Sequence, residues 1–175
     1  MKKYLLSFLV LFFVLSFGSA FAYNAPYNTA PENVKLGNAT FTLPNKYVVF
    51  RTNDNNTVSC GNESTGEIIT FAIKDSERNI DLNSNAAIQA VRNVAAKMNS
   101  NILKIERFDL NGKIIITTKE QNNRGEHVKA YFFWQGNLYL ISFTQFPPYG
   151  YGELGFIENY EQARNLLLFI INSVR

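Results

Sequence analysis

Cys60 and His127 are the chain's only cysteine and only histidine. A catalytic pair of a thiol or hydroxyl nucleophile with a histidine base would therefore have to use His127, with Cys60 as the one thiol available. Cys60 lies in Val-Ser-Cys-Gly-Asn, which lacks a nucleophile signature, and His127 follows a polar turn at residues 122–126. We expect an incidental thiol and a solvent-exposed imidazole at the start of a strand, and no catalytic pair.

A short acidic stretch offers the oxygen ligands that calcium prefers. Asp75, Glu77 and Asp81 lie close together there, among polar neighbours. The stretch lacks the central glycine and the terminal bidentate glutamate of a calcium loop. One histidine and one cysteine, far apart, do not make a zinc site without several carboxylates. We therefore expect a solvated linker, with no metal and no cofactor.

Aromatic residues in a Pro/Gly-rich segment are the strongest candidates for a binding surface. Phe146, Tyr149 and Tyr151 lie in Phe-Pro-Pro-Tyr-Gly-Tyr-Gly, which breaks helix and strand alike. Tyrosine rings suit contact with a ligand or partner because they combine apolar area with a polar tip. The alternative is a lid folded over a sheet edge or helix end. Trp134, beside a hairpin turn, would join the surface unless it packs in the core.

The first 22 residues have the layout of a secretory signal peptide. Lys2 and Lys3 precede an apolar run, residues 4–17, that is shorter than the roughly 20 residues of a membrane-spanning helix. The small residues of the Ala-x-Ala end predict cleavage between Ala22 and Tyr23. The protein is then secreted or extracytoplasmic, at the cell surface or in the periplasm. The alternative is an uncleaved leader that anchors the chain in a membrane.

Composition bounds what the exported part can be. Of 17 basic residues, Lys2 and Lys3 leave with the leader, so 15 remain against 14 acidic residues, which gives no basic excess for nucleic acid. A single cysteine excludes an internal disulfide, so packing alone holds the fold. The Asn-rich chain also contains three N-glycosylation sequons, which matter only if the host glycosylates exported proteins: Asn38, Asn55 and Asn62.

The pattern of the chain after the leader predicts one domain. Residues 23–34 are rich in Pro and Asn without periodicity and predict a flexible lead-in, and residues 35–175 form the domain. We expect short strands within 38–43, 47–51 and 57–60, and a stronger strand at 67–73. Two hairpins follow, one turning at Asn111-Gly112 and one at 135–137. The nearly continuous apolar arms of the second hairpin predict central strands covered on both faces.

Two helices complete the pattern. Apolar residues at helical spacing predict a helix over 81–98, capped by Ser84 or Asn85 and buried through residues that include Met98. A second helix is predicted over 156–174, where only Arg164 is out of character. Hairpins separated by helices predict an α+β domain in which two helices sandwich a mostly antiparallel sheet.

At this point the chain resembles a known family. A Gly37–Pro44 opening is followed by the strand Ile68–Ile73, a mid-chain helix, two long hairpins and a C-terminal helix that ends Ile-Ile-Asn-Ser-Val. This order is similar to the PsbP-like α/β/α sandwich. The resemblance rests on element order and hydrophobic texture, so no family residue carries over. It implies a small exported module that acts by binding or by assisting assembly.

These observations favour a non-enzymatic module that binds a protein or an envelope component. Two alternatives stay open. One is an exported hydrolase that uses paired carboxylates which the sequence does not identify. The other is a carrier for a small ligand, which would need a deep apolar pocket between sheet and helix. The oligomeric state is not set by the sequence.

Overall fold

The computed structural model describes residues 32–51, 56–74, 80–147 and 154–175. Antiparallel hairpins make up most of the architecture. The predicted leader and residues 23–31 of the lead-in lie outside these ranges. Seven strands form one sheet in which every neighbouring pair is antiparallel. Its order is β3 (Val48–Arg51), β4 (Thr57–Asn62), β5 (Glu67–Lys74), β9 (Asn137–Gln145), β8 (Gly125–Trp134), β7 (Lys113–Asn122), β6 (Asn101–Leu110).

Two of the turns show why the meander from β6 to β9 forms. Asn111 and Gly112 have φ values of 54° and 77°, as a two-residue turn between right-twisted strands requires, and this confirms the first predicted hairpin. Gln135 and Gly136 connect β8 to β9 with φ values of 46° and 79°. This second turn is therefore two residues long, and Asn137 already belongs to β9.

A separate two-stranded sheet is formed by β1 (Asn33–Leu36) and β2 (Ala39–Thr42), joined by a turn in which Gly37 has a φ of 58°. The strand expected within 38–43 is confirmed as β2. β1 begins two residues before the expected domain boundary, because Val34 and Leu36 are both buried in the core.

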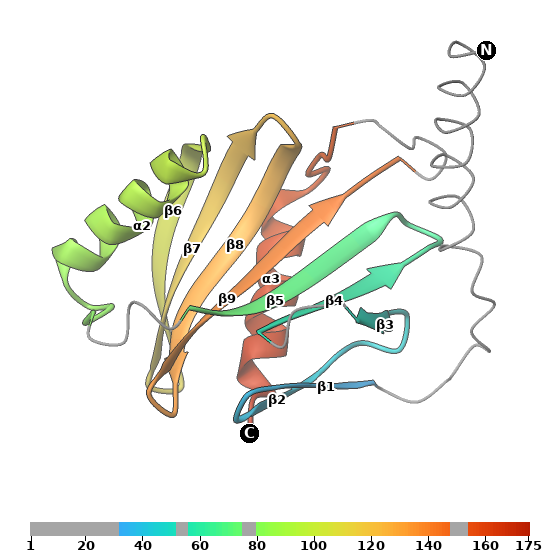
Figure 1. Ribbon diagram of the computed structural model, residues 1–175, viewed down its shortest axis with the longest axis horizontal. Helices are drawn as coiled ribbons and strands as arrows, with labels where there is room; N and C mark the ends of the chain where they lie inside the picture. Colours follow the sequence, from blue (N-terminus) through green and yellow to red (C-terminus); the bar gives the residue numbers. More distant parts are fainter. Residues whose placement is uncertain (1–31, 52–55, 75–79, 148–153) are drawn as a thin grey trace, which may run out of the picture.

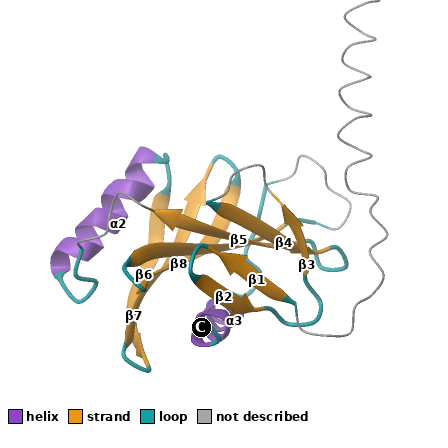
Figure 2. Cartoon of the chain, turned by 60° about the horizontal axis from the view of Figure 1, so that its bottom comes forward, coloured by secondary structure: helices purple, strands orange, loops and turns teal. Residues whose placement is uncertain are grey.

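Two helices lie on opposite faces of the large sheet (Figure 1). They are α2 (Asn85–Lys97) and α3 (Tyr160–Asn172). α3 packs on β8, β9 and β2, whereas α2 lies along β6 at one margin of the sheet. Figure 2 shows β1 and β2 on the same side of the sheet as α3. The predicted α+β sandwich is confirmed, with α2 covering a margin of its face.

Local sequence explains where the helices begin. The Ser84 hydroxyl accepts a hydrogen bond from the Ala87 N–H at 3.2 Å, and the Asn159 side chain accepts one from Gln162 at 3.1 Å. These caps satisfy N–H groups that have no partner within the helix. Both helices are shorter than predicted. Met98, expected to be buried, is 49% exposed because α2 ends one residue before it.

The core is divided by the sheet into two clusters. The larger cluster fills the space between the sheet, α3 and the β1–β2 sheet, and it contains the rings of Phe41, Phe71, Phe132 and Tyr139 in mutual contact. The smaller one lies on the α2 side. The central position of β8 and β9, covered on both faces, agrees with their apolar sequence. Within the described ranges, no helix is long and apolar enough to cross a membrane.

Candidate binding surface

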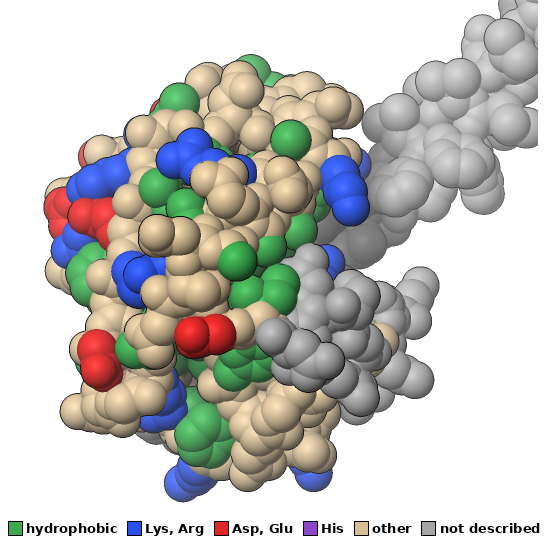
Figure 3. Space-filling view, turned by 90° about the vertical axis from the view of Figure 1, so that its left-hand side faces the viewer, with side chains coloured by type: hydrophobic (Ala, Val, Ile, Leu, Met, Phe, Trp, Pro, Cys, Tyr) green, Lys and Arg blue, Asp and Glu red, His purple; other side chains and the backbone are tan. Residues whose placement is uncertain are grey.

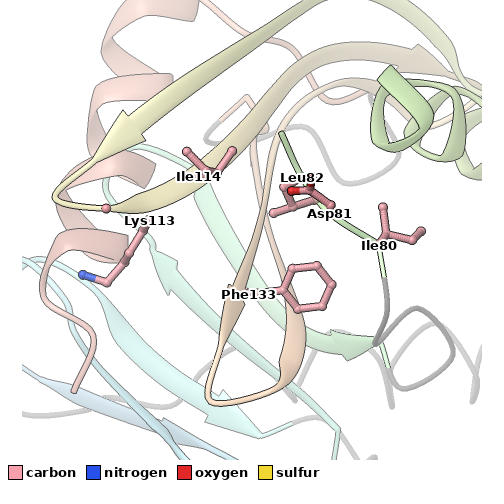
Figure 4. Close-up of a pocket in the computed structure, with 7 residues that line it drawn as sticks. Ile80, Asp81, Leu82, Lys113, Ile114 and Phe133 are labelled. Atoms are coloured by element: carbon pink, nitrogen blue, oxygen red, sulfur yellow. The ribbon is translucent and has the colours of Figure 1, made fainter. Parts of the chain in front are cut away.

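A hollow of about 230 Å³ opens on the α2 side of the sheet, at the end where the β6–β7 and β8–β9 turns lie (Figure 4). Three separate segments line it: the stretch before α2, the start of β7 and the end of β8. Its lining combines apolar side chains with polar and charged groups and consists of Ile80, Asp81, Leu82, Gly112, Lys113, Ile114 and Phe133. We call this surface the turn-end hollow.

Hydrogen bonds fix the stretch before α2 that forms one wall of the hollow. The Asp81 carboxylate accepts from the Asn83 N–H at 2.9 Å, and the Asp81 carbonyl accepts from the Ser84 N–H at 2.9 Å. The Arg107 guanidinium of β6 donates to the Ser84 carbonyl at 2.7 Å. These bonds tie the wall to the edge strand of the sheet, so the hollow has a defined shape.

Lys113 and Trp134 extend the same end of the molecule toward the α3 side. The Lys113 amine lies 5.4 Å from the centroid of the Trp134 ring, which is cation–π distance. Figure 4 shows that the Lys113 amine points away from the other labelled side chains. The Trp134 indole N–H is buried and has no hydrogen-bond partner among the described residues. Trp134 packs against the larger core cluster, the competing role anticipated for it.

The predicted aromatic surface is divided by the fold. Phe146 follows the end of β9, and Trp134 lies at the opposite end of the β8–β9 hairpin. Phe146 is half-buried, and its N–H donates to the Gly66 carbonyl at 2.9 Å. Phe146 and Trp134 therefore do not form one surface. Tyr149 and Tyr151 lie outside the described residues, so the choice between lid and contact stays a prediction for them.

Cys60 and His127 are separated by two strands. Cys60 is on β4 and His127 on β8, with β5 and β9 between them. Cross-strand pairing places Cys60 on the same sheet face as Val128, so His127, the preceding residue, faces the other side. Burial raises the pKa of the Cys60 thiol to about 12. The expectation that these residues do not form a pair agrees with this geometry.

The environment of His127 differs from the prediction. The imidazole is half-buried, and its Nε2 lies 3.3 Å from the Asn122 side-chain oxygen. Burial, followed by the nearby Lys129 ammonium, lowers the pKa of His127 below its ordinary value. The polar turn suggested exposure, but His127 is the third residue of a central strand, and its neighbours shield it.

A buried polar cluster next to His127 was not predicted. Glu120 is fully buried, and its carboxylate accepts from the Lys129 ammonium at 2.5 Å and from the Thr118 hydroxyl at 2.8 Å. The Tyr131 hydroxyl donates to the same carboxylate at 3.4 Å. The available signal was Lys129 itself, a charged residue within the apolar run Val-Lys-Ala-Tyr-Phe-Phe-Trp. A buried cation in a central strand requires a buried anion.

Paired carboxylates do occur, but in an ion-pair network between β6 and α3. Arg164 contacts Glu106 at 3.1 Å and also Glu161, and the Tyr160 hydroxyl donates to Glu106 at 2.7 Å. Burial alone would raise the pKa of Glu106, but hydrogen bonds from Tyr160, Lys104 and Arg164 outweigh it and lower the pKa. A general acid of a glycosidase needs a raised pKa, so this network does not support that chemistry.

The remaining candidates have defined places. Asp81 is engaged in the turn before α2, and Asp75 and Glu77 lie outside the described residues. Among the described residues, no group of three potential ligands could hold a metal ion.

Of the sequons, Asn38 is exposed, Asn55 lies outside the described ranges, and Asn62 is buried. The Asn62 amide donates to Glu67 at 3.3 Å, so glycosylation of the folded protein could reach Asn38 but not Asn62.

The surface carries charge of both signs. Figure 3 shows basic and acidic side chains scattered among hydrophobic ones on the face that includes the α2 margin. This agrees with the near balance of basic and acidic residues after removal of the leader.

The arrangement of strands and helices is an α+β domain with a PsbP-like fold. It is similar to the solution structure of cyanobacterial PsbP from Synechocystis sp. PCC 6803, at 12% identity and a TM-score of 0.56, over 89% of this chain and 98% of that one. It is also similar to the Ran-binding protein Mog1p of Saccharomyces cerevisiae, at 15% identity and a TM-score of 0.52, over 85% of this chain and 96% of that one. No protein-family model and no curated protein matches the chain. The similarities to these two solved structures show the fold of the chain.

Proposed function

We propose that the protein is a secreted or extracytoplasmic, non-enzymatic module that binds a protein or envelope component through the turn-end hollow. The signal-peptide pattern of residues 1–22, with cleavage between Ala22 and Tyr23, supports export. One structural neighbour, Mog1p, is described as a Ran-binding protein, which is consistent with a binding role for this fold.

The size and lining of the hollow carry this proposal. Its apolar walls, Ile80, Leu82, Ile114 and Phe133, would accept an apolar side chain. At about 230 Å³ it is smaller than the 300–1,000 Å³ typical of small-molecule sites. It therefore favours one anchoring side chain of a partner protein over a carried ligand, as in interfaces dominated by a few buried anchors.

Site-specific photocrosslinking tests the proposal. A photoreactive residue at Asp81, an exposed residue in the lining of the hollow, should give a discrete adduct with one partner in envelope or culture fractions of the producing cells. The same residue at Lys97, on α2, is the control and should not give that adduct. Excess unlabelled protein should abolish the adduct.

Two competitor variants link the adduct to the hollow. Ile80→Glu places a charge in the apolar wall and should no longer compete. Phe169→Glu places the same charge on α3, where Phe169 is 57% exposed, and should compete as the unaltered protein does. Equal competition by both variants would contradict binding at the hollow.

Intact mass of the exported protein tests export separately, because retention of residues 1–22 would contradict cleavage.

A further inference from the structure

The β6–β7 turn contains the chain's one Asn-Gly pair, and the two residues are joined to different parts of the fold. The Asn111 side-chain amide donates to the Asn172 side-chain oxygen of α3 at 2.8 Å. The Gly112 backbone N–H donates to the Asp109 carboxylate at 2.8 Å. Both turn residues are exposed to solvent, and nothing lies within 4 Å of the position that a Gly112 side chain would take.

Asn-Gly pairs can deamidate without an enzyme. The glycine N attacks the asparagine side-chain carbon, its proton is lost, and ammonia leaves from the tetrahedral adduct as a five-membered succinimide closes. Water then opens the ring at either carbonyl and produces aspartate or isoaspartate. Glycine favours the reaction because it has no side chain to hinder closure of the ring. Water is the one co-reactant, and nothing is oxidised or reduced.

We propose that Asn111 is a site of spontaneous deamidation whose rate is set by the hydrogen bonds from the turn to Asn172 and Asp109. The bond to Asn172 holds the side-chain amide away from the ring-closing rotamer. The bond to the Asp109 carboxylate occupies the Gly112 N–H and opposes loss of its proton. The reactive pair is thus protected in the folded chain and released when the turn separates from α3.

Deamidation would also change this end of the molecule. The product at position 111 is a carboxylate, which cannot donate to the Asn172 oxygen, so the Asn172 side chain must turn its amide NH2 toward position 111 to keep a hydrogen bond. The present hydrogen bond from turn to helix is broken, and a negative charge is added next to Gly112, which lines the turn-end hollow. Modification would therefore change both the contact between turn and helix and the charge beside the proposed binding surface. This inference does not depend on the hollow having a partner.

Peptide mapping by mass spectrometry after incubation at mildly alkaline pH tests the proposal. The samples are the full chain without its leader, the Asn172→Ala and Asp109→Ala variants, and a synthetic peptide of residues 106–117. We expect the peptide to convert fastest and the unaltered protein slowest. Each variant should convert about fivefold faster than the unaltered protein, the factor that corresponds to one hydrogen bond of about 1 kcal/mol.

Asn165→Ala, which removes another exposed asparagine of α3, is the matched control and should convert at the unaltered rate. Circular dichroism of each variant verifies that it is folded, so that faster conversion is not global unfolding. Conversion of Asn172→Ala and Asp109→Ala at the unaltered rate would overturn the proposal. Conversion of the unaltered protein as fast as the peptide would overturn it as well.

Discussion

Glu120 and Lys129 form a buried ion pair, so a single change at either residue leaves the other charge without its partner. Both are almost completely removed from water, and their charges compensate each other within a cluster that Thr118 and Tyr131 complete. Removing one partner of a buried ion pair leaves an uncompensated charge, whereas replacing both with apolar residues is often nearly neutral. The pair therefore specifies which residues meet across β7 and β8 more than it adds stability.

Lys129→Met should lower the free energy of unfolding by about 3–5 kcal/mol, because the Glu120 carboxylate would remain buried without its cation. The double variant Lys129→Met/Glu120→Leu should recover most of this loss. Urea denaturation followed by circular dichroism measures both. A double variant less stable than Lys129→Met would show that the remaining Thr118 and Tyr131 hydroxyls, not the charge, determine the outcome.

His127 should make stability depend on pH near neutrality. Its pKa in the folded state lies below the ordinary 6.5, chiefly because it is buried, so the unfolded chain binds a proton more readily. The free energy of unfolding should therefore decrease as the pH falls from about 7 toward about 5. His127→Gln should flatten this interval, since no other histidine is present. An unchanged slope in the variant would mean that another group titrates there.

At the scale of elements, α3 is connected to edge strand β6 by polar contacts as well as by apolar packing. Glu106 of β6 accepts hydrogen bonds from Tyr160 and Arg164, and the Arg164 guanidinium lies 5.1 Å from the Phe108 ring. These contacts explain why a charged residue, Arg164, occurs among the apolar residues that repeat at helical spacing in α3. Its charge neutralises a carboxylate on β6, and its guanidinium lies over the Phe108 and Tyr160 rings.

Glu106→Ala should lower the free energy of unfolding by about 1–3 kcal/mol, because hydrogen bonds that involve a charged group are worth that much. Glu161→Ala is the control, since Glu161 belongs to the same network but is 53% exposed. Its effect should stay below about 1 kcal/mol, as for surface ion pairs. Chemical denaturation measures both variants, and equal losses would contradict the special position of Glu106.

The sequence predicts the order of helices and strands, but it does not predict the contacts between segments that lie far apart along the chain. The Asn111-Gly112 turn and the Ser84 cap carry local chemistry, so both were predicted and both are confirmed. The burial of His127 depends on the central place of β8 between β7 and β9, which the polar residues around His127 do not indicate. The turn-end hollow likewise brings together segments around Ile80, Ile114 and Phe133, whose meeting requires the complete sheet order. The residue pattern within one segment does not indicate which distant segments lie next to it in the fold.

At the scale of the whole molecule, the residues after α3 join this helix to the β1–β2 sheet. The Thr40 N–H of β2 donates to the Arg175 carbonyl at 3.0 Å, and the Arg175 N–H donates to the Thr40 carbonyl at 3.2 Å. The Ser173 hydroxyl accepts from the Thr42 N–H at 2.8 Å. Val174, between them, is buried in the larger core cluster. The first strands and the last helix are therefore parts of one cooperative unit.

Deleting residues 173–175 should lower the free energy of unfolding by roughly 4.5–6 kcal/mol. Loss of a buried valine contributes about 1.5–3 kcal/mol, and each lost hydrogen bond adds about 1 kcal/mol. Arg175→Ala keeps the backbone bonds and should leave stability unchanged, which makes it the matched control. Hydrogen exchange should show faster exchange of the Val34 and Phe41 amides in the deletion variant together with those of α3. Faster exchange confined to α3 would mean that the β1–β2 sheet is held by its own packing, and the tail would then be an attachment of the helix alone.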